Sequence, residues 1–196
     1  MSHRIYHTQG IILGKVPFGE SNYFFHIITK DFGVIGVLAQ GVRELKSKLR
    51  PNLEMLSYGD VDLVRGKEVW RLTNANTIRT FKTLVRHTDK VLVYGRVAGF
   101  LRRLMPGEKA HEEIFNDLLT ALCFLEEGDI DNEMLKNFET ILVMRVLNDL
   151  GYVGERKTFD RFLKNGEWDY ALLSQFSPYR FKAQRVINQA LKESHL

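Results

Sequence analysis

The first eighty residues alternate short runs of β-branched and aromatic side chains with turn residues, and this pattern restricts the N-terminal part to β-structure. Five strands are expected, at residues 10–16, 22–29, 34–39, 58–64 and 68–77. Glycine favours hairpin turns at 31–33 and 65–67, because such turns require a positive φ. Five short strands that need closure predict a small barrel of the oligonucleotide/oligosaccharide-binding (OB) type, and an SH3-like barrel is the nearest alternative.

After Phe81 the apolar residues recur at helical spacing instead. A first long helix should end at Pro106-Gly107, and a second should span about 110–127. A third should begin at Asp131 or Asn132 and end at Gly151, and a last one should span about 178–193, after a poorer segment with an Asn165-Gly166 turn. The chain is therefore predicted to be α+β, with a β-barrel domain of residues 1–80 and an α-helical domain of residues 81–196.

The predicted loop between the third and fourth strands is strongly basic. It carries Arg43, Lys46, Lys48 and Arg50 against one acid, Glu44. Residues 1–85 hold 12 Lys or Arg against 7 Asp or Glu, whereas residues 86–150 hold 8 against 12. This asymmetry predicts that an anion meets the N-terminal part, since a cationic surface attracts polyanions.

Composition narrows the class of protein. The single cysteine, Cys123, cannot form a disulfide within the chain and excludes a framework of thiolate zinc ligands. No stretch approaches the roughly 20 apolar residues of a membrane span, and the first residues lack the apolar core of a signal peptide. We therefore expect a cytoplasmic protein without membrane association.

Motifs that would indicate catalysis, nucleotide binding or metal binding are weak. The dipeptide Gly14-Lys15 lacks the rest of a phosphate-binding P-loop, and His111-Glu112 lacks the second histidine of a zinc-protease motif. Asp60 and Asp62 share a strand face and could hold a metal ion, but a solvated pair of carboxylates is commoner. We predict no catalytic residue, no metal site and no cofactor.

Features for binding a polyanion are stronger, because Lys and Arg neutralise phosphates and aromatic rings stack on bases. Glycine at position 41 would let the loop backbone follow a strand. Phe18, Tyr58 and Trp70 are candidate stacking rings, although barrel core is the better interpretation for Tyr58 and Trp70. The cations predicted to contact nucleic acid are Lys15, Arg43, Lys46, Lys48, Arg50, Arg65, Lys67 and Arg71.

Several short motifs, in this order, resemble the RecO family of recombination mediators. They are Gln9-Gly10-Ile11-Ile12-Leu13, Phe18-Gly19-Glu20-Ser21-Asn22, Thr29-Lys30-Asp31-Phe32-Gly33, Gly41-Val42-Arg43 with Lys46-Ser47-Lys48-Leu49, and Leu150-Gly151-Tyr152. The resemblance implies an N-terminal OB-fold, a helical C-terminal domain and no enzymatic turnover. It also implies DNA contact at Gly41, Arg43, Lys46, Ser47 and Lys48.

The resemblance further implies a function and partners. Family members bind single- and double-stranded DNA, anneal complementary strands and act with RecR to help load RecA onto DNA covered by single-stranded-DNA-binding protein. A cytoplasmic, nucleoid-associated protein in DNA repair and recombination is therefore expected. Arg102 and Arg103, on the first long helix, are the candidates for docking a partner.

Two departures from the family pattern stand out. Gln40 occupies a position that is basic in many relatives. Many relatives also carry a four-cysteine zinc module after the Leu-Gly-Tyr motif, and this module is absent here, because residues 153–168 contain no cysteine. Phe159, Phe162 and Trp168 are expected to form an apolar substitute.

Three hypotheses follow from the sequence. The first is a DNA-binding mediator of recombinational repair without an active site. The second is a protein-interaction adaptor with weak affinity for DNA. The third is a metal-dependent nucleic-acid enzyme that uses Asp60 and Asp62.

Overall fold

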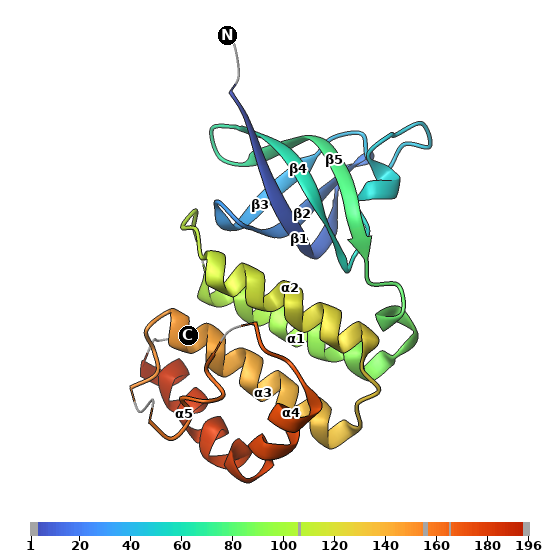
Figure 1. Cartoon of the computed structure of the whole chain (residues 1–196). Helices are drawn as coiled ribbons and strands as arrows, with labels where there is room; N and C mark the ends of the chain where they lie inside the picture. The colour runs from blue at the N-terminus through green and yellow to red at the C-terminus, as the bar shows by residue number, and fades with distance from the viewer. Residues whose placement is uncertain (1–3, 106, 155–156, 165, 194–196) are drawn as a thin grey trace. The chain divides into compact units, whose positions relative to one another are not determined.

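The computed structural model describes residues 4–105, 107–154, 157–164 and 166–193 (Figure 1). The chain divides into two compact units. The first unit comprises Met1–Lys82 and Ala98–Phe115, and the second comprises Thr83–Val97 and Asn116–Leu196.

Five strands of the first unit form a closed barrel, as predicted from the sequence. Their order around the barrel is β1-β2-β3-β5-β4. The strands are β1 (Ile5–Phe18), β2 (Asn22–Thr29), β3 (Gly33–Ala39), β4 (Ser57–Arg65) and β5 (Trp70–Thr80). Strand β1 begins earlier than expected, because its polar first half pairs with β4 while its second half pairs with β2.

Two glycines allow neighbouring strands to approach closely. A Cβ atom on Gly10 would lie 2.7 Å from Cγ2 of Ile27, and one on Gly59 would lie 2.2 Å from the carbonyl oxygen of Asn76. Gly10 pairs with Thr29 on one side and with Gly59 on the other. Glycine is therefore required where β1 turns from one partner strand to the next.

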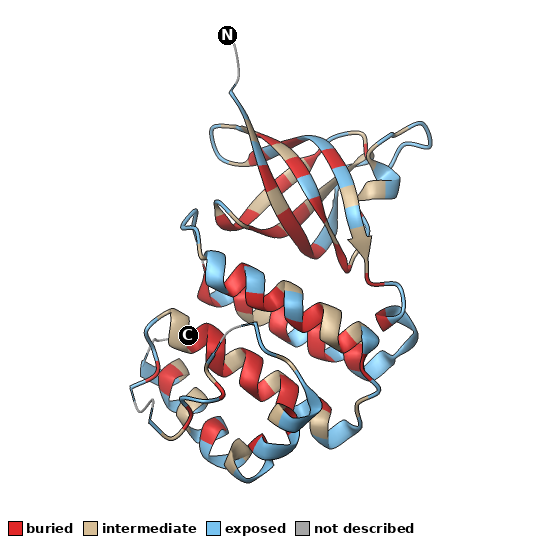
Figure 2. Cartoon of the chain, in the orientation of Figure 1, coloured by how far each residue is buried: buried red, intermediate tan, exposed pale blue. Residues whose placement is uncertain are grey.

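The barrel closes through a short parallel contact between β3 and β5. Val37 pairs with Trp70 and Leu38 pairs with Arg71. Trp70 is 4% exposed and its ring lies against those of Tyr6 and Phe32, with centroids 5.3 and 5.0 Å away. Trp70 is thus a core residue, as the sequence favoured. Buried apolar residues from all five strands fill the interior. Figure 2 marks the buried positions along the strands in red.

The helices agree with the predicted pattern except in two places. They are α1 (Thr88–Leu104), α2 (Glu112–Glu127), α3 (Asn132–Asp149), α4 (Tyr170–Phe176) and α5 (Arg180–Glu193). The first helix starts only at Thr88, since Leu84–Arg86 form a separate 3₁₀ turn. Helix α4 was not predicted, because its seven residues are too few to show a period.

Helix ends follow the expected capping residues where the structure describes them. The Asp131 carboxylate accepts a hydrogen bond from the Met134 amide at the start of α3, and Gly151 follows its end with φ +84°. Two residues of these signals lie outside the described residues: Pro106 of the predicted helix stop and Asn165 of the predicted turn. Gly107 and Gly166 both have positive φ, as those signals require.

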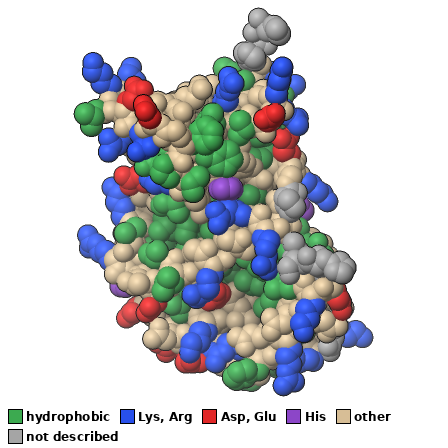
Figure 3. All heavy atoms as spheres, turned by 180° about the vertical axis from the view of Figure 1, so that it is seen from behind, with side chains coloured by type: hydrophobic (Ala, Val, Ile, Leu, Met, Phe, Trp, Pro, Cys, Tyr) green, Lys and Arg blue, Asp and Glu red, His purple; other side chains and the backbone are tan. Residues whose placement is uncertain are grey.

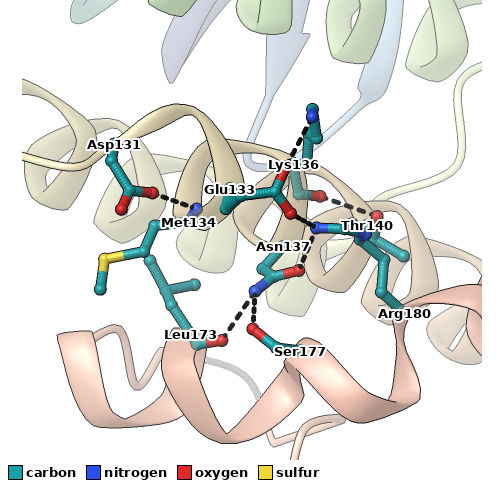
Figure 4. A network of polar contacts seen from close by, with 9 residues as sticks. All are labelled: Asp131, Glu133, Met134, Lys136, Asn137, Thr140, Leu173, Ser177 and Arg180. Carbon is teal, nitrogen blue, oxygen red and sulfur yellow. Dashed lines mark hydrogen bonds and ion pairs between the residues drawn. The ribbon is translucent and has the colours of Figure 1, made fainter.

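A polar network joins α3 to the C-terminal helices (Figure 4). The Asn137 amide, which is fully buried, donates to the Leu173 carbonyl and to the Ser177 hydroxyl. Arg180 donates to Glu133 and to the Asn137 carbonyl oxygen. Each side chain in this group therefore satisfies a polar atom of another element, which fixes α5 against α3.

A buried ion pair organises the segment that follows α3. Arg145, 1% exposed, donates to the Asp117 carboxylate at 2.8 Å and to the carbonyls of Phe162 and Glu167. Its guanidinium lies 4.3 Å from the ring centroid of Trp168. The same Asp117 oxygen also accepts from the Gly166 amide and the Trp168 indole.

The described residues of the segment 153–168 therefore pack without thiolate ligands. Phe159 and Phe162 are 0% and 1% exposed, and the ring centroid of Trp168 lies 4.6 Å from that of Phe138. This confirms the predicted apolar substitute and adds Arg145, which sequence reasoning had not singled out.

Replacing Arg145 by Met should destabilise the protein by about 3–5 kcal/mol, because it leaves the Asp117 carboxylate buried without its cation. Burial raises the pKa of Asp117, and Arg145 lowers it, so the variant should have a still higher pKa there. A carboxyl group whose pKa is raised in the folded state makes the protein less stable as the pH rises through that pKa.

Urea unfolding should therefore show that the free energy of unfolding of Arg145→Met is lower than that of the wild type. This deficit should be greatest near neutral pH and shrink on acidification. The exposed Arg185→Met on α5 is the matched control and should change stability by less than about 0.5 kcal/mol. A pH-independent deficit would contradict this role for Asp117.

Candidate nucleic-acid interface

The basic loop, residues 40–52, folds into a series of turns between β3 and β4. Gly41 has φ +63°, a conformation that favours glycine. The Glu44 amide donates to the Gly41 carbonyl, and the Ser47 amide donates to the Glu44 carbonyl, both at 3.1 Å. Two successive turns thus shape the loop, which ends in the 3₁₀ turn Arg50–Asn52.

Three hydrogen bonds attach the base of the basic loop to the hairpin between β1 and β2. The Gly41 amide donates to Oδ1 of Asn22 at 2.9 Å. The Arg43 amide donates to the Ser21 carbonyl at 2.9 Å, and its guanidinium donates to the Gly19 carbonyl at 3.0 Å. The loop and the hairpin therefore form one local framework.

The loop cations are not neutralised by acids of the described chain. Lys46, Lys48 and Arg50 are exposed, and none has a carboxylate partner within 4 Å among the residues that the structure describes. The Glu44 carboxylate folds back instead, with Oε1 3.5 Å from where a Cβ on Gly41 would lie. In Figure 3, Lys and Arg side chains gather around this loop at the upper left.

Lys15 is brought to the same framework by the pairing of β1 with β2. Its ammonium lies 5.4 Å from the ring centroid of Tyr23, and the Arg43 guanidinium lies 5.7 Å from the same ring. Both contacts are at cation–π distance. Tyr23 thus holds two predicted DNA-contacting cations from separate elements, a role that the sequence had not indicated for it.

Arg71 is exposed on β5 and pairs with Leu38, two residues before the loop begins. Lys67 and Arg71 line an open depression of about 640 Å³ around the β4–β5 hairpin. Arg65 lines it too, but its guanidinium is paired with the Glu108 carboxylate at 2.8 Å and lies 5.7 Å from the Trp70 ring. Arg65 is therefore less available to a polyanion than the loop cations.

The two arginines suggested for partner docking differ in their surroundings. Arg102 lies against the barrel, with Nη1 3.3 Å from where a Cβ on Gly14 would be. Burial, and secondarily the Arg102 charge, lower the pKa of His26 on β2. Arg102 and Arg103 are both exposed, so exposure does not separate the two candidates.

Aromatic side chains separate into core and surface. Tyr58 is half-buried with its ring centroid 6.3 Å from that of Phe115, and Trp70 is 4% exposed. Phe18, at the end of β1, is 54% exposed. Of the three rings considered from sequence, Phe18 is the one placed for stacking.

Of the two carboxylates considered for a nuclease, Asp62 is engaged in hydrogen bonds and Asp60 is exposed. Asp62 contacts His7 at 2.6 Å and accepts from the Asn74 amide. Asp60, Asp62 and Asp31 line one open depression, but Asp31 accepts from the Thr8 hydroxyl. Within the described ranges, no group of three or more His, Cys, Asp or Glu could hold a metal ion.

None of the helices, over the residues described, has the length and apolarity needed to cross a membrane.

Comparison with known proteins agrees with this architecture. Residues 1–81 match the family model described as "Recombination protein O N terminal". The chain is 32% identical over 136 residues to a "DNA repair protein RecO" of Dehalococcoides mccartyi, covering 69% of this chain and 54% of that protein. The chain belongs to the RecO family.

Other RecO proteins give similar matches. The one from Thermodesulfovibrio yellowstonii is 28% identical over 154 residues, covering 78% of this chain and 60% of that protein. The one from Rubrobacter xylanophilus is 30% identical over 125 residues, covering 64% and 50%. The chain thus spans about half the length of the curated RecO proteins it matches.

Gly41→Ala should destabilise the basic loop by about 1–2 kcal/mol, because alanine disfavours the left-handed conformation. Gly95, exposed within α1 with no heavy atom within 4 Å of where a Cβ would lie, offers a control of opposite sign. Gly95→Ala should stabilise by about 0.5–1 kcal/mol through helix propensity. Thermal unfolding of both variants checks this, and a harmless Gly41→Ala would argue against a rigid loop.

Proposed function

We propose that the chain is a non-enzymatic DNA-binding mediator of repair, with the basic loop as its principal DNA contact. The main support is electrostatic: Lys46, Lys48 and Arg50 are exposed and lack carboxylate partners among the described residues. Displacing condensed counterions from phosphates then gives favourable binding free energy without first breaking internal ion pairs. Family membership, and the relatives' name "DNA repair protein RecO", support DNA as the polyanion.

The predicted contacts fall into two sets. The loop set comprises Lys15, Gly41, Arg43, Lys46, Ser47, Lys48 and Arg50, and the hairpin set comprises Arg65, Lys67 and Arg71. We assign phosphate binding chiefly to the loop set, because Arg65 is paired with Glu108. Gly41 and Ser47 contribute through the backbone turns that shape the loop.

We also propose that the two domains have the separate roles that the family implies. Residues 1–80 would bind single- and double-stranded DNA, and the helical residues 81–196 would dock protein partners. These partners are RecR and single-stranded-DNA-binding protein, with RecA acting downstream. A cytoplasmic, nucleoid-associated location follows from binding DNA.

Removing the loop cations should weaken the salt dependence of DNA binding. For a variant with Arg43, Lys46, Lys48 and Arg50 all changed to Ala, the slope of log K against log salt for single-stranded DNA should fall by about 3 in magnitude. Fluorescence anisotropy at a series of salt concentrations measures the slope.

A second variant controls for net charge. Lys157, Lys164, Arg185 and Lys192 are exposed cations of the second unit without carboxylate partners among the described residues. Changing these four to Ala removes the same charge and should alter the slope by less than about 1. Equal effects of both variants would mean diffuse attraction, and an unchanged slope in the loop variant would favour the protein adaptor.

The purified chain should accelerate annealing of complementary strands coated with single-stranded-DNA-binding protein, with no nucleotide or metal added. Annealing needs only that two polyanions be held together, so no cofactor is expected. Strand pairing followed by fluorescence quenching measures the rate. Metal-dependent cleavage that is abolished by Asp60→Asn would instead support the enzyme hypothesis.

A further inference from the structure

Leu45 is the most exposed large apolar side chain in the part of the chain that the structure describes, at 93%. It lies in the basic loop between Arg43 and Lys46, where charged neighbours are exposed as well. Single exposed apolar residues are common on protein surfaces. Here the residue lies within the surface proposed to bind DNA, so its apolar side chain is available to contact that ligand.

The loop is built in a way that keeps Leu45 outside the core. The turns closed by the Glu44 and Ser47 amides fix the backbone on either side of it. Val42 and Leu53, at the two ends of the loop, are 1% and 3% exposed and anchor it to the barrel core. Leu49 packs against that core as well, so Leu45 alone among the loop's leucines is left outside.

Phe18 provides a second exposed apolar side chain on the same framework. It is 54% exposed and precedes Gly19, whose carbonyl accepts from the Arg43 guanidinium. The hairpin and the loop are joined through Asn22 and Ser21 as well. Each apolar side chain is therefore carried by an element held to the other, and Arg43 bonds the two elements together.

We propose that Leu45 and Phe18 contact unstacked bases of a single-stranded nucleic acid whose phosphates are held by the loop cations. This inference rests on the proposed function and names the substrate class of the same site. Bases alternate with phosphates along a single strand, which matches apolar side chains spaced among cations. In a duplex the bases are stacked and paired, and exposing them costs a few kcal/mol. These two contacts would therefore add affinity for single strands to the phosphate binding that single strands and duplexes share.

The arrangement fits a nucleic acid better than an anionic lipid surface. A lipid layer favours several apolar side chains inserted together at one tip. Here the loop exposes one leucine, while Leu49 faces the core, and Phe18 stands on a different element. Base contact by an apolar wedge or a stacked ring needs only single side chains.

The test compares two strands of equal length and charge, a 20-nucleotide oligothymidylate and an abasic phosphodiester chain. The wild-type protein should bind oligothymidylate more tightly. Leu45→Ala and Phe18→Ala should each weaken oligothymidylate binding about tenfold and leave abasic binding unchanged. Neither change should alter the salt slope, since no phosphate contact is lost.

Val85→Ala is the matched control, because Val85 is 64% exposed but belongs to the second unit. It should leave both affinities unchanged. Equal weakening of oligothymidylate and abasic binding by Leu45→Ala would overturn the proposal, since it would indicate a distorted loop. Unchanged oligothymidylate binding would overturn it too, and lost binding to phosphatidylserine vesicles in that variant would point to lipid.

Failure of the proposed function gives a different result. In that case the wild-type protein binds neither strand at moderate salt, and the inference falls with it. If the wild-type protein instead binds both strands tightly and with equal affinity, the proposed DNA binding stands and only the proposed contact with bases is rejected.

Discussion

The hydrogen bonds between the basic loop and the β1–β2 hairpin determine how the barrel presents its charge. Loops as cationic as this one repel themselves and gain entropy by moving. Here the Gly41 amide is fixed by Asn22, and Arg43 is fixed by carbonyls of Ser21 and Gly19. Because the acceptors are neutral, they hold the loop without cancelling its charge.

The arginines of the chain occupy contrasting environments. Arg145 is buried, paired with Asp117 and bonded to the carbonyls of Phe162 and Glu167, so its charge serves to hold these residues against α3. Arg50 is exposed and has no carboxylate partner among the residues described. Arg65 is intermediate, since it is exposed but paired with Glu108. Accessible charge, and not the number of cations, separates the residues proposed to contact DNA from the structural ones.

The sequence predicted the barrel, the helices and the basic loop because each depends on local pattern or composition. The alternation in β4 and the Asp131 cap are examples. Short or non-periodic elements escaped it: α4 has too few residues for a period, and the first half of β1 is too polar to show as a strand until β4 pairs with it.

Residues that act through tertiary contacts were also missed. Arg145 occupies a core position in the helical spacing of Phe138 and Leu142, and this signal could have marked it as a buried charge. Asn22 and Tyr23 act through bonds to residues about twenty positions away, which no local pattern reveals. The exposure of Leu45 likewise depends on how the loop is anchored at both ends.

The central claim is that the charge of the basic loop is open to a polyanion. Lysine acetylation with mass spectrometry, with and without single-stranded DNA, tests it residue by residue. Lys46 and Lys48 should be protected by DNA, whereas Lys164 in the second unit should react equally in both conditions. Protection of other lysines, with Lys46 and Lys48 reacting unchanged, would contradict the account.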